Sequence, residues 1–253
     1  MPECAERAAP ASPPHPVLND YYVHARARQS RVNAMFDAAA RHYDRIERVM
    51  SFGTGQRYRR EALTRASVRS GMRVLDVGCG TGLLTAQAAA ITGPRGREVA
   101  IDPSAGMLNQ ALALGAPQAV RGVGDALPFH DAAFEVVSMG YALRHVADLE
   151  RAFREFRRVL KPGGVALLLE ITPPASHAAR VLLKFYLKYL IPTAARLGLP
   201  GREAGALMSY YWATIEQCVP PATILDALRR VGFGRVRRHV ELGIFSAYTA
   251  VNA

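Results

Sequence analysis

A glycine-rich segment, Asp76-Val-Gly-Cys-Gly-Thr-Gly82, is the part of this sequence whose residue types and spacing most clearly point to chemistry. It follows a short β-type run, residues 73–77, and precedes a helix-forming stretch, residues 83–90. Its three glycines let the backbone turn tightly and bring a bulky ligand against main-chain amides at a helix N-terminus. Leu83 stands where a dinucleotide-binding loop would have its third glycine, which disfavours NAD.

Two acidic positions follow this segment at places where an adenosyl ligand needs them. Asp102 lies 20 residues after Gly82 at the end of a predicted strand, 98–102, where a carboxylate can bind both hydroxyls of a ribose. Asp125 and Ala126 follow another predicted strand, 119–123, where an acid can accept a hydrogen bond from an exocyclic adenine amine. Each acid alone is typical of a helix cap or a surface group. The prediction of an adenosyl ligand therefore depends on the order in which the two acids follow the glycine-rich segment.

The elements that must position these residues alternate between strands and helices. Further strands are predicted at 134–139 and 165–171, and the last is rich in apolar residues, as expected for burial on both faces. Helices are predicted at 104–114, with Ser104 as N-cap, and at 148–160 and 222–231, before a closing hairpin of 235–241 and 244–251. This alternation predicts a mostly parallel sheet with helices on both sides.

The flanking regions follow other patterns. Residues 1–16 contain prolines and acidic residues without an apolar run, which predicts a flexible tail and not a signal peptide. Residues 17–70 predict an N-terminal helical cap with a break at 51–55. The remaining residues, 71–253, form the predicted core domain. Within it, residues 173–221 are too long for a simple connection, so we expect a helical lid inserted over the site.

The composition excludes some classes of protein but does not identify a binding partner. Half of the residues are hydrophobic, and the three cysteines (Cys4, Cys79, Cys218) lie far apart, so neither a disulfide framework nor a cysteine zinc site is predicted and a reducing cytoplasm is expected. The net charge of +11 is almost all arginine. This charge has two interpretations. Either codon bias has placed arginine where other sequences have lysine, or the positive surface attracts nucleic acid, anionic membranes or acidic molecules. Because the arginines are spread along the chain, nucleic acid is disfavoured.

The order of these features resembles the class I S-adenosylmethionine-dependent methyltransferases over residues 73–171. That resemblance implies a Rossmann-like α/β fold with a mostly parallel seven-stranded sheet and a C-terminal antiparallel hairpin. It also implies S-adenosylmethionine as cofactor and no metal. The residues that it implies for cofactor binding are Tyr43, Asp76, Gly78, Cys79, Gly80, Thr81, Gly82, Asp102, Pro103, Met107, Asp125, Ala126 and Gly140.

A closer resemblance covers nearly the whole chain and concerns the ubiquinone/menaquinone biosynthesis C-methyltransferases of the UbiE type. It is carried by Phe36-Asp-Ala-Ala-Ala-Arg-His-Tyr-Asp44, Met50-Ser-Phe-Gly53, Tyr58-Arg-Arg60, Asp125-Ala-Leu-Pro-Phe129, Ala142-Leu-Arg-His-Val146, Arg158-Val-Leu-Lys-Pro-Gly-Gly164 with Leu169-Glu170, residues 210–220 and Val231-Gly-Phe233. Three departures matter: Cys79 replaces a usual glycine, Gly140 a usual serine and His145 a usual asparagine. The first leaves cofactor binding intact, whereas the other two lie at the substrate edge and leave the exact acceptor open.

Two neighbouring residues are the candidates for catalysis. In the resembled family, the arginine matching Arg144 assists proton removal from the acceptor through a water, and a guanidinium can stabilise a phenolate. His145 could take the proton directly, because an imidazole titrates near neutral pH. The structural alternatives are an ion pair between Arg144 and Asp148 and a hydrogen-bonded His145 without a catalytic role. Glu170 is a further candidate for substrate contact.

The resemblance implies C-methylation of a prenylated benzoquinol or naphthoquinol. The apolar lid is either a groove for an isoprenoid tail, with arginines holding an anionic membrane surface, or a packed lid or homodimer interface. The expected location is the cytoplasm, with peripheral contact at the inner membrane face. The alternatives are an O- or N-methyltransferase of another small or lipid-like acceptor, an RNA-binding methyltransferase and a non-catalytic binder.

Overall fold

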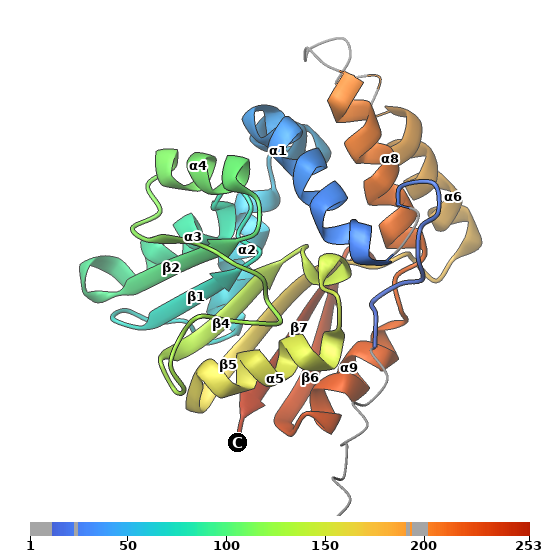
Figure 1. Cartoon of the computed structure of the whole chain (residues 1–253). Coiled ribbons are helices and arrows are strands. Elements are labelled where there is room, and N and C mark those ends of the chain that lie inside the picture. Colours follow the sequence, from blue (N-terminus) through green and yellow to red (C-terminus); the bar gives the residue numbers. More distant parts are fainter. Residues whose placement is uncertain (1–11, 23–24, 191–192, 194–201) are drawn as a thin grey trace, which may run out of the picture.

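Seven strands form one sheet in the order β3-β2-β1-β4-β5-β7-β6 (Figure 1). The computed structural model describes residues 12–22, 25–190, 193 and 202–253. The strands are β1 Arg73–Val77, β2 Arg97–Asp102, β3 Ala119–Arg121, β4 Phe134–Gly140, β5 Leu160–Ile171, β6 Phe233–Glu241 and β7 Phe245–Asn252. Strands β1 to β5 pair in parallel, and β7 pairs antiparallel with both β5 and β6. The expected parallel sheet with a closing antiparallel hairpin is therefore confirmed.

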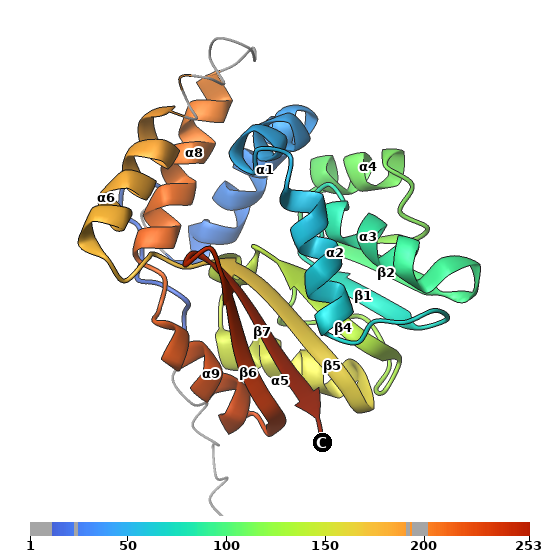
Figure 2. The ribbon, with the colours of Figure 1, turned by 180° about the vertical axis from the view of Figure 1, so that it is seen from behind.

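Helices cover both faces of the sheet, as Figures 1 and 2 show from opposite sides. On one face lie α5 Leu149–Val159 and α9 Pro221–Arg230, and on the other lie α2 Gly55–Arg65, α3 Leu83–Thr92 and α4 Ala105–Ala113. Alternation along β1 assigns its side chains to these faces: Leu75 packs in the α5 cluster, whereas Val74 packs against α3. Because both faces are covered, the central strands can be almost wholly apolar.

The N-terminal region divides between the cap and the core. Helix α1 Ala25–Met50 lies across the carboxyl ends of the strands, whereas α2, which the sequence assigned to the cap, packs directly on α3 and the sheet. Residues 12–22 also pack against the body of the protein. The amide of Leu149 donates to Ser12 O (2.9 Å), that of Val219 donates to Pro14 O (2.8 Å), and His15 is buried. The part of the expected tail that is described, residues 12–16, is thus held by backbone bonds, and residues 1–11 lie outside the described residues.

The insertion between β5 and α9 contains helices of its own. These are α6 His177–Phe185, a π-helical turn Tyr186–Leu190 and α8 Arg202–Glu216. Helix α8 packs on α1 through one apolar cluster, which includes Ala39, Ile46, Leu207, Tyr211 and Trp212. Cap and lid therefore support each other above the sheet. Among all the residues that the structure describes, no helix is both long enough and apolar enough to cross a membrane.

Candidate active site

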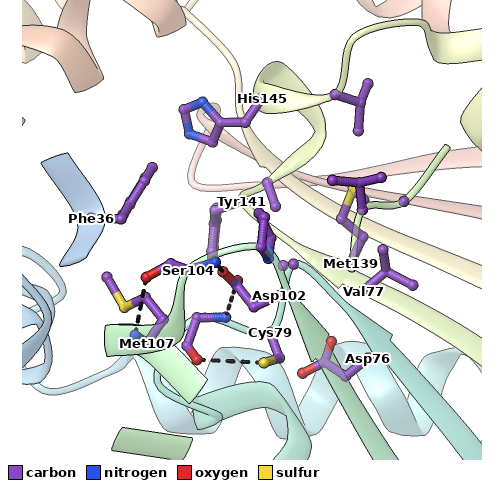
Figure 3. Close-up of a pocket in the computed structure, with 18 of the residues that line it drawn as sticks. Phe36, Asp76, Val77, Cys79, Asp102, Ser104, Met107, Met139, Tyr141 and His145 are labelled. Atoms are coloured by element: carbon purple, nitrogen blue, oxygen red, sulfur yellow. Dashed lines mark hydrogen bonds between the residues drawn. The ribbon is translucent and has the colours of Figure 1, made fainter. Parts of the chain in front are cut away.

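A cleft of about 1000 Å³ opens at the carboxyl ends of β1, β2 and β4 (Figure 3). Ligands bind at this position in doubly wound sheets, because connections on the two sides of β1 diverge there. The residues of the expected site that line this cleft are Tyr43, Asp76, Gly78, Cys79, Gly80, Thr81, Asp102, Pro103, Met107, Asp125, Gly140 and His145. Gly82, Ala126 and Arg144 are not among its lining residues. Gly82 instead begins α3 and packs against Ala111.

The glycine loop leaves room for a ligand. Both Gly78 (φ +64°) and Gly80 (φ +55°) have left-handed backbone conformations that favour glycine. A Cβ on Gly78 would come within 2.6 Å of the Ala142 side chain, whereas a Cβ on Gly80 would meet no atom within 4 Å. Gly78 thus permits close packing between the β1 and β4 ends, and Gly80 faces open space in the cleft. These positions fit a cradle for a bulky ligand.

Asp102 presents a carboxylate at the end of β2. Its Oδ2 accepts from the Gly80 amide (2.9 Å) and its Oδ1 from the Ser104 amide (2.8 Å), as drawn in Figure 3. Burial raises the pKa of Asp102 to about 6, and the two backbone hydrogen bonds oppose that shift. The carboxylate is thereby fixed beside the glycine loop, where the sequence predicts that it binds a ribose.

Asp76 occupies a different environment below the loop. Its carboxylate accepts from the hydroxyls of Thr85 (2.7 Å) and Ser138 (2.8 Å), which joins β1 to α3 and β4. Burial raises the pKa of Asp76 to about 6 as well. Asp76 therefore supports the floor of the cleft as well as lining it.

Helix α1 closes the cleft through two aspartates. Asp44 accepts a hydrogen bond from the Thr81 hydroxyl in the glycine loop. Asp37 accepts from the Ser104 hydroxyl (2.6 Å) and from the Gly106 amide (2.8 Å) at the start of α4. A carboxylate at a helix N-terminus is favourable, so Asp37 clamps α1 onto α4. Both aspartates lie in the family-like stretch 36–44, within which the sequence favoured Tyr43 as the cofactor contact, but no local pattern identified Thr81 or the start of α4 as their partners.

A second cavity of about 1260 Å³ lies between the cap, the lid and the β6–β7 hairpin. Most of its lining side chains are apolar or aromatic, and the apolar ones include Ile46, Met50, Ile171, Leu183, Leu187, Met208, Ile244 and Phe245. Four side chains, Tyr43, Arg59, Tyr141 and Tyr211, line both this cavity and the cleft. The two spaces therefore share one mostly aromatic wall, which we call the tyrosine wall.

The tyrosine wall is held by contacts between distant segments. The hydroxyls of Tyr43 and Tyr211 are hydrogen-bonded to each other. The Arg59 guanidinium lies 5.4 Å from the centre of the Tyr141 ring and pairs with Glu47 at 2.7 Å. Tyr141 has a φ of +60°, which costs on the order of 1–2 kcal/mol for a side chain of this kind. Such a conformation at a cavity wall indicates that the position of this ring matters.

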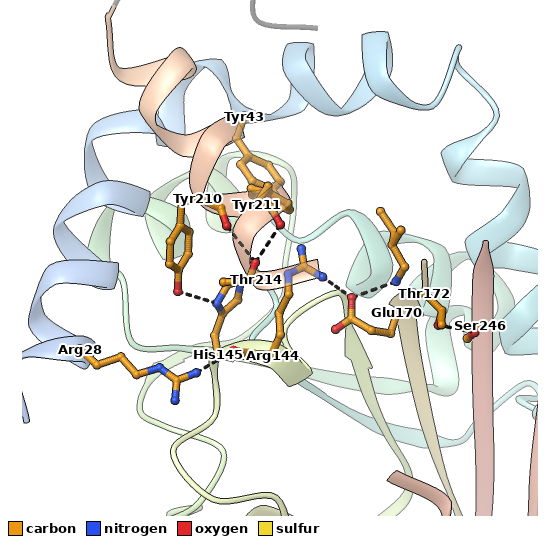
Figure 4. Close-up of polar contacts among 11 residues, drawn as sticks. Arg28, Tyr43, Arg144, His145, Glu170, Thr172, Tyr210, Tyr211, Thr214 and Ser246 are labelled. Carbon is orange, nitrogen blue, oxygen red and sulfur yellow. Dashed lines mark hydrogen bonds and ion pairs between the residues drawn. The ribbon is translucent and has the colours of Figure 1, made fainter. Parts of the chain in front are cut away.

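Arg144 is buried behind the wall and not exposed in the cleft (Figure 4). It forms an ion pair with Glu170, and its guanidinium lies 4.7 Å from the centre of the Tyr211 ring. Burial alone would lower the pKa of Arg144, but Glu170 and the neighbouring tyrosines raise it, so the guanidinium stays charged. Asp148, the alternative partner, instead accepts from the Glu150 and Arg151 amides as the N-cap of α5.

His145 faces the cleft with one nitrogen free. Its Nδ1 is 3.1 Å from the Tyr210 hydroxyl, whereas its buried Nε2 has no hydrogen-bond partner among the described residues. Burial, with a smaller contribution from Arg144, holds the pKa of His145 well below its usual value. The ring is therefore neutral at physiological pH, and an Nδ1–H bond to Tyr210 would leave a lone pair on Nε2.

Comparisons with known proteins agree with this geometry. A sequence model of the ubiE/COQ5 methyltransferase family matches residues 24–252. The chain is 31% identical to a demethylmenaquinone methyltransferase of Geobacillus kaustophilus, over 83% of this chain and 99% of that protein. It is 34% identical to a 2-phytyl-1,4-naphtoquinone methyltransferase of Thermosynechococcus vestitus, over 87% and 98% of the two chains.

Solved structures extend the likeness to the fold. A SAM-dependent methyltransferase of Thermotoga maritima, described as a "possible histamine N-methyltransferase", matches with a TM-score of 0.62 at 18% identity, over 87% of this chain and 99% of that one. Such a likeness concerns the fold alone. Together with the family match, it confirms the expected Rossmann-like class I fold and S-adenosylmethionine as the cofactor. In the part of the chain that the structure describes, no three His, Cys, Asp or Glu side chains gather as metal ligands.

The raised pKa of Asp102, about 6, predicts that cofactor affinity depends on pH. The ionised carboxylate accepts hydrogen bonds from ribose hydroxyls better than the protonated acid, so affinity should fall as pH falls through 6. Calorimetric titration with S-adenosylhomocysteine, which lacks the sulfonium charge, should give an affinity about tenfold weaker at pH 5 than at pH 7.5.

Two variants test whether Asp102 or Asp76 causes the pH dependence of affinity, because the pKa of Asp76 is also about 6. Asp102→Asn should bind more weakly at pH 7.5 and lose the pH dependence, whereas Asp76→Asn should keep it. A pH dependence that survives in Asp102→Asn and disappears in Asp76→Asn would contradict the assignment.

Proposed function

This chain belongs to the ubiE/COQ5 methyltransferase family and is an S-adenosylmethionine-dependent methyltransferase, and on that premise we propose that it methylates a ring carbon of a quinol that carries an isoprenoid tail. The observation that carries the proposal is the tyrosine wall, which is shared by a cleft that contains carboxylates and the glycine loop and by a second, more apolar cavity. A quinol with its ring at the wall would have its tail in the apolar cavity. The names of both relatives favour a naphthoquinol over a benzoquinol ring.

The apolar cavity suits a tail better than it suits a small polar acceptor. Its three acidic lining residues, Glu47, Glu61 and Glu241, each pair with an arginine, so their charges are already balanced. An amine acceptor would gain from a free carboxylate here, and the described lining offers none. Burying an isoprenoid chain against the apolar lining is favourable by about 25 cal/mol per Å² of apolar surface. These features support a prenylated acceptor over an N-methylation substrate.

The residues that would hold the cofactor are those of the cleft. Asp102 would bind the ribose hydroxyls, Gly80 offers open space beside the loop, and Asp125, which lines the same cleft, would accept from an adenine amine. When bound, S-adenosylmethionine supplies an electrophilic methyl group on a sulfonium. The protein must then position the acceptor and draw a proton from it, since a phenolate makes a quinol ring more nucleophilic.

His145 is positioned for that proton transfer. Its neutral ring lines the cleft, contacts Tyr210 through Nδ1 and has a buried Nε2 without a partner among the described residues, and this Nε2 would accept the proton of a quinol hydroxyl. The buried Arg144 contributes positive charge behind the Tyr211 ring, which stabilises the developing phenolate through space. Glu170 balances that charge in the resting protein. His145 therefore acts as general base, and Arg144 acts through its charge.

Product analysis tests the proposed reaction. The protein is incubated with S-adenosylmethionine and chemically reduced demethylmenaquinone with a short prenyl tail, and the product is examined by mass spectrometry and NMR. We expect one added methyl group on the ring carbon next to a quinol oxygen. A methyl group on oxygen would support the O-methyltransferase alternative, and the absence of any methylated quinol would contradict the proposal.

Substitution of the proposed base should separate catalysis from binding. His145→Gln keeps a polar side chain but removes the imidazole, so we expect turnover to fall by about 100-fold or more, with S-adenosylhomocysteine affinity unchanged. Tyr210→Phe is the matched control, because it removes only the partner of Nδ1 and should reduce turnover by less. Wild-type turnover in His145→Gln would exclude His145 as the base.

A further inference from the structure

Large apolar side chains from three separate segments are exposed on one side of the molecule. They are Phe52 between α1 and α2, Leu242 in the β6–β7 turn, and Val181, Leu182, Phe185 and Tyr189 in and after α6. We call them the apolar rim. Phe52 is 80% exposed, Leu242 81% and Leu182 68%. Several large exposed apolar side chains in neighbouring segments can mark an interaction site.

The segments that carry the apolar rim border the second cavity. Leu242 itself lines that cavity. Phe52 stacks on the ring of Tyr186, with centroids 5.7 Å apart, and Tyr186 lines the cavity and donates to Met50 O (2.9 Å). In Figure 2, α6, the α1–α2 junction and the β6–β7 turn lie above the same end of the sheet. The exposed side chains therefore come from the three segments that border this cavity.

Helix α6 presents different apolar residues on its two sides. Leu183 points to the cavity and packs with the cluster between cap and lid, whereas Val181, Leu182 and Phe185 are exposed. None of its residues is buried. A helix with apolar residues on its outer face gains little from the protein itself, because most tertiary stabilisation comes from an apolar face that is covered. A partner surface would supply the missing contact.

Charge indicates which partner fits. The acidic side chains that line the cavity are neutralised by Arg57, Arg59 and Arg65, and Lys184 on α6 pairs with Glu216 at 3.1 Å. No ion pair of the described residues balances Arg180 on α6, so these contacts leave no excess negative charge at the rim, and the whole chain carries +11. A lipid bilayer with an apolar interior and negatively charged headgroups complements both the apolar rim and the positive net charge. A second copy of this chain would carry the same net charge and would repel the first.

We propose that the apolar rim docks on the surface of an anionic lipid bilayer, so that the second cavity opens toward the acyl chains. In this arrangement a tailed acceptor enters from the bilayer without crossing water. The side chains of Leu182, Phe185 and Phe52 insert among the lipids, and the net charge adds long-range attraction. The role of docking in substrate entry rests on the proposed function, but the docking itself does not.

Vesicle co-sedimentation of the full chain tests the docking. We expect binding to phosphatidylcholine vesicles that contain phosphatidylglycerol, and weaker binding to vesicles of phosphatidylcholine alone or at high salt. Leu182→Ser with Phe185→Ser should weaken binding at least tenfold. The matched control is Leu112→Ser with Leu114→Ser, which removes two exposed leucines at the end of α4 and should leave binding unchanged. Thermal melts check that both variants fold.

Three results would overturn the docking proposal. The first is equal vesicle binding by both double variants, and the second is no vesicle binding by the wild-type protein. The third is a wild-type dimer in sedimentation equilibrium that Leu182→Ser with Phe185→Ser converts to a monomer, because the rim would then be an interface between copies.

Activity distinguishes this proposal from the proposed function. The Leu182 and Phe185 side chains do not line the cavity, so the double variant should methylate a water-soluble, short-tailed quinol at the wild-type rate. Its rate on a long-tailed quinol embedded in vesicles should fall at least tenfold. If vesicle binding depends on the rim but the wild-type protein methylates no quinol, the proposed function is refuted and the docking is not. If the double variant methylates the embedded quinol at the wild-type rate, the docking is refuted and the proposed function is not.

Discussion

The buried ion pair between Arg144 and Glu170 is the interaction on which the arrangement of this site depends. Burying two charges costs several kcal/mol per ion, so the pair persists only because its surroundings fix both partners. The Ile171 amide donates to Glu170 (2.9 Å), Tyr211 covers the guanidinium, and Arg28 of α1 donates to the Arg144 carbonyl (2.7 Å). The pair therefore ties the end of β5, the 143–145 turn, the lid and the cap together (Figure 4).

Fixing these four elements creates two adjoining spaces, of which the second is the more apolar. The cleft has carboxylates and backbone amides from β1, β2 and the glycine loop, whereas the second cavity has mainly apolar side chains from cap, lid and hairpin. Helix α1 contributes to both, and Asp37 and Asp44 hold it against the cleft. A polar cofactor and an apolar acceptor can thus approach one another across the tyrosine wall while each stays in a favourable environment.

The sequence predicted the parts of the fold and site that depend on local patterns. The glycine loop, Asp102 and the Ser104 N-cap follow from neighbouring residues, because turn and cap chemistry is local. The partner of Arg144 was not predictable in this way. Asp148, four residues away, was the local candidate, but it caps α5, and the actual partner is 26 residues distant at the end of β5.

The second cavity is also a product of distant contacts. Tyr211 meets Tyr43 across 168 residues, and Arg59 meets Tyr141 only because α2 packs near the end of β4. Each of these residues alone has the pattern of ordinary core packing. Phe36 illustrates the same limit, because its ring packs with Tyr43 and also lines the cleft. Periodicity predicts burial but not which cavity a buried ring borders.

The measurement that most directly tests the use of both cavities is methylation rate against tail length. A series of reduced demethylnaphthoquinones with no, one, two and three prenyl units would be assayed in solution for kcat/KM. Since 1.4 kcal/mol corresponds to tenfold in affinity, burial of the first units should raise kcat/KM by about tenfold or more. Tyr211→Ala, which opens the wall, should lower kcat for every member of the series. A kcat/KM that does not change with tail length would contradict the assignment of the second cavity to the tail.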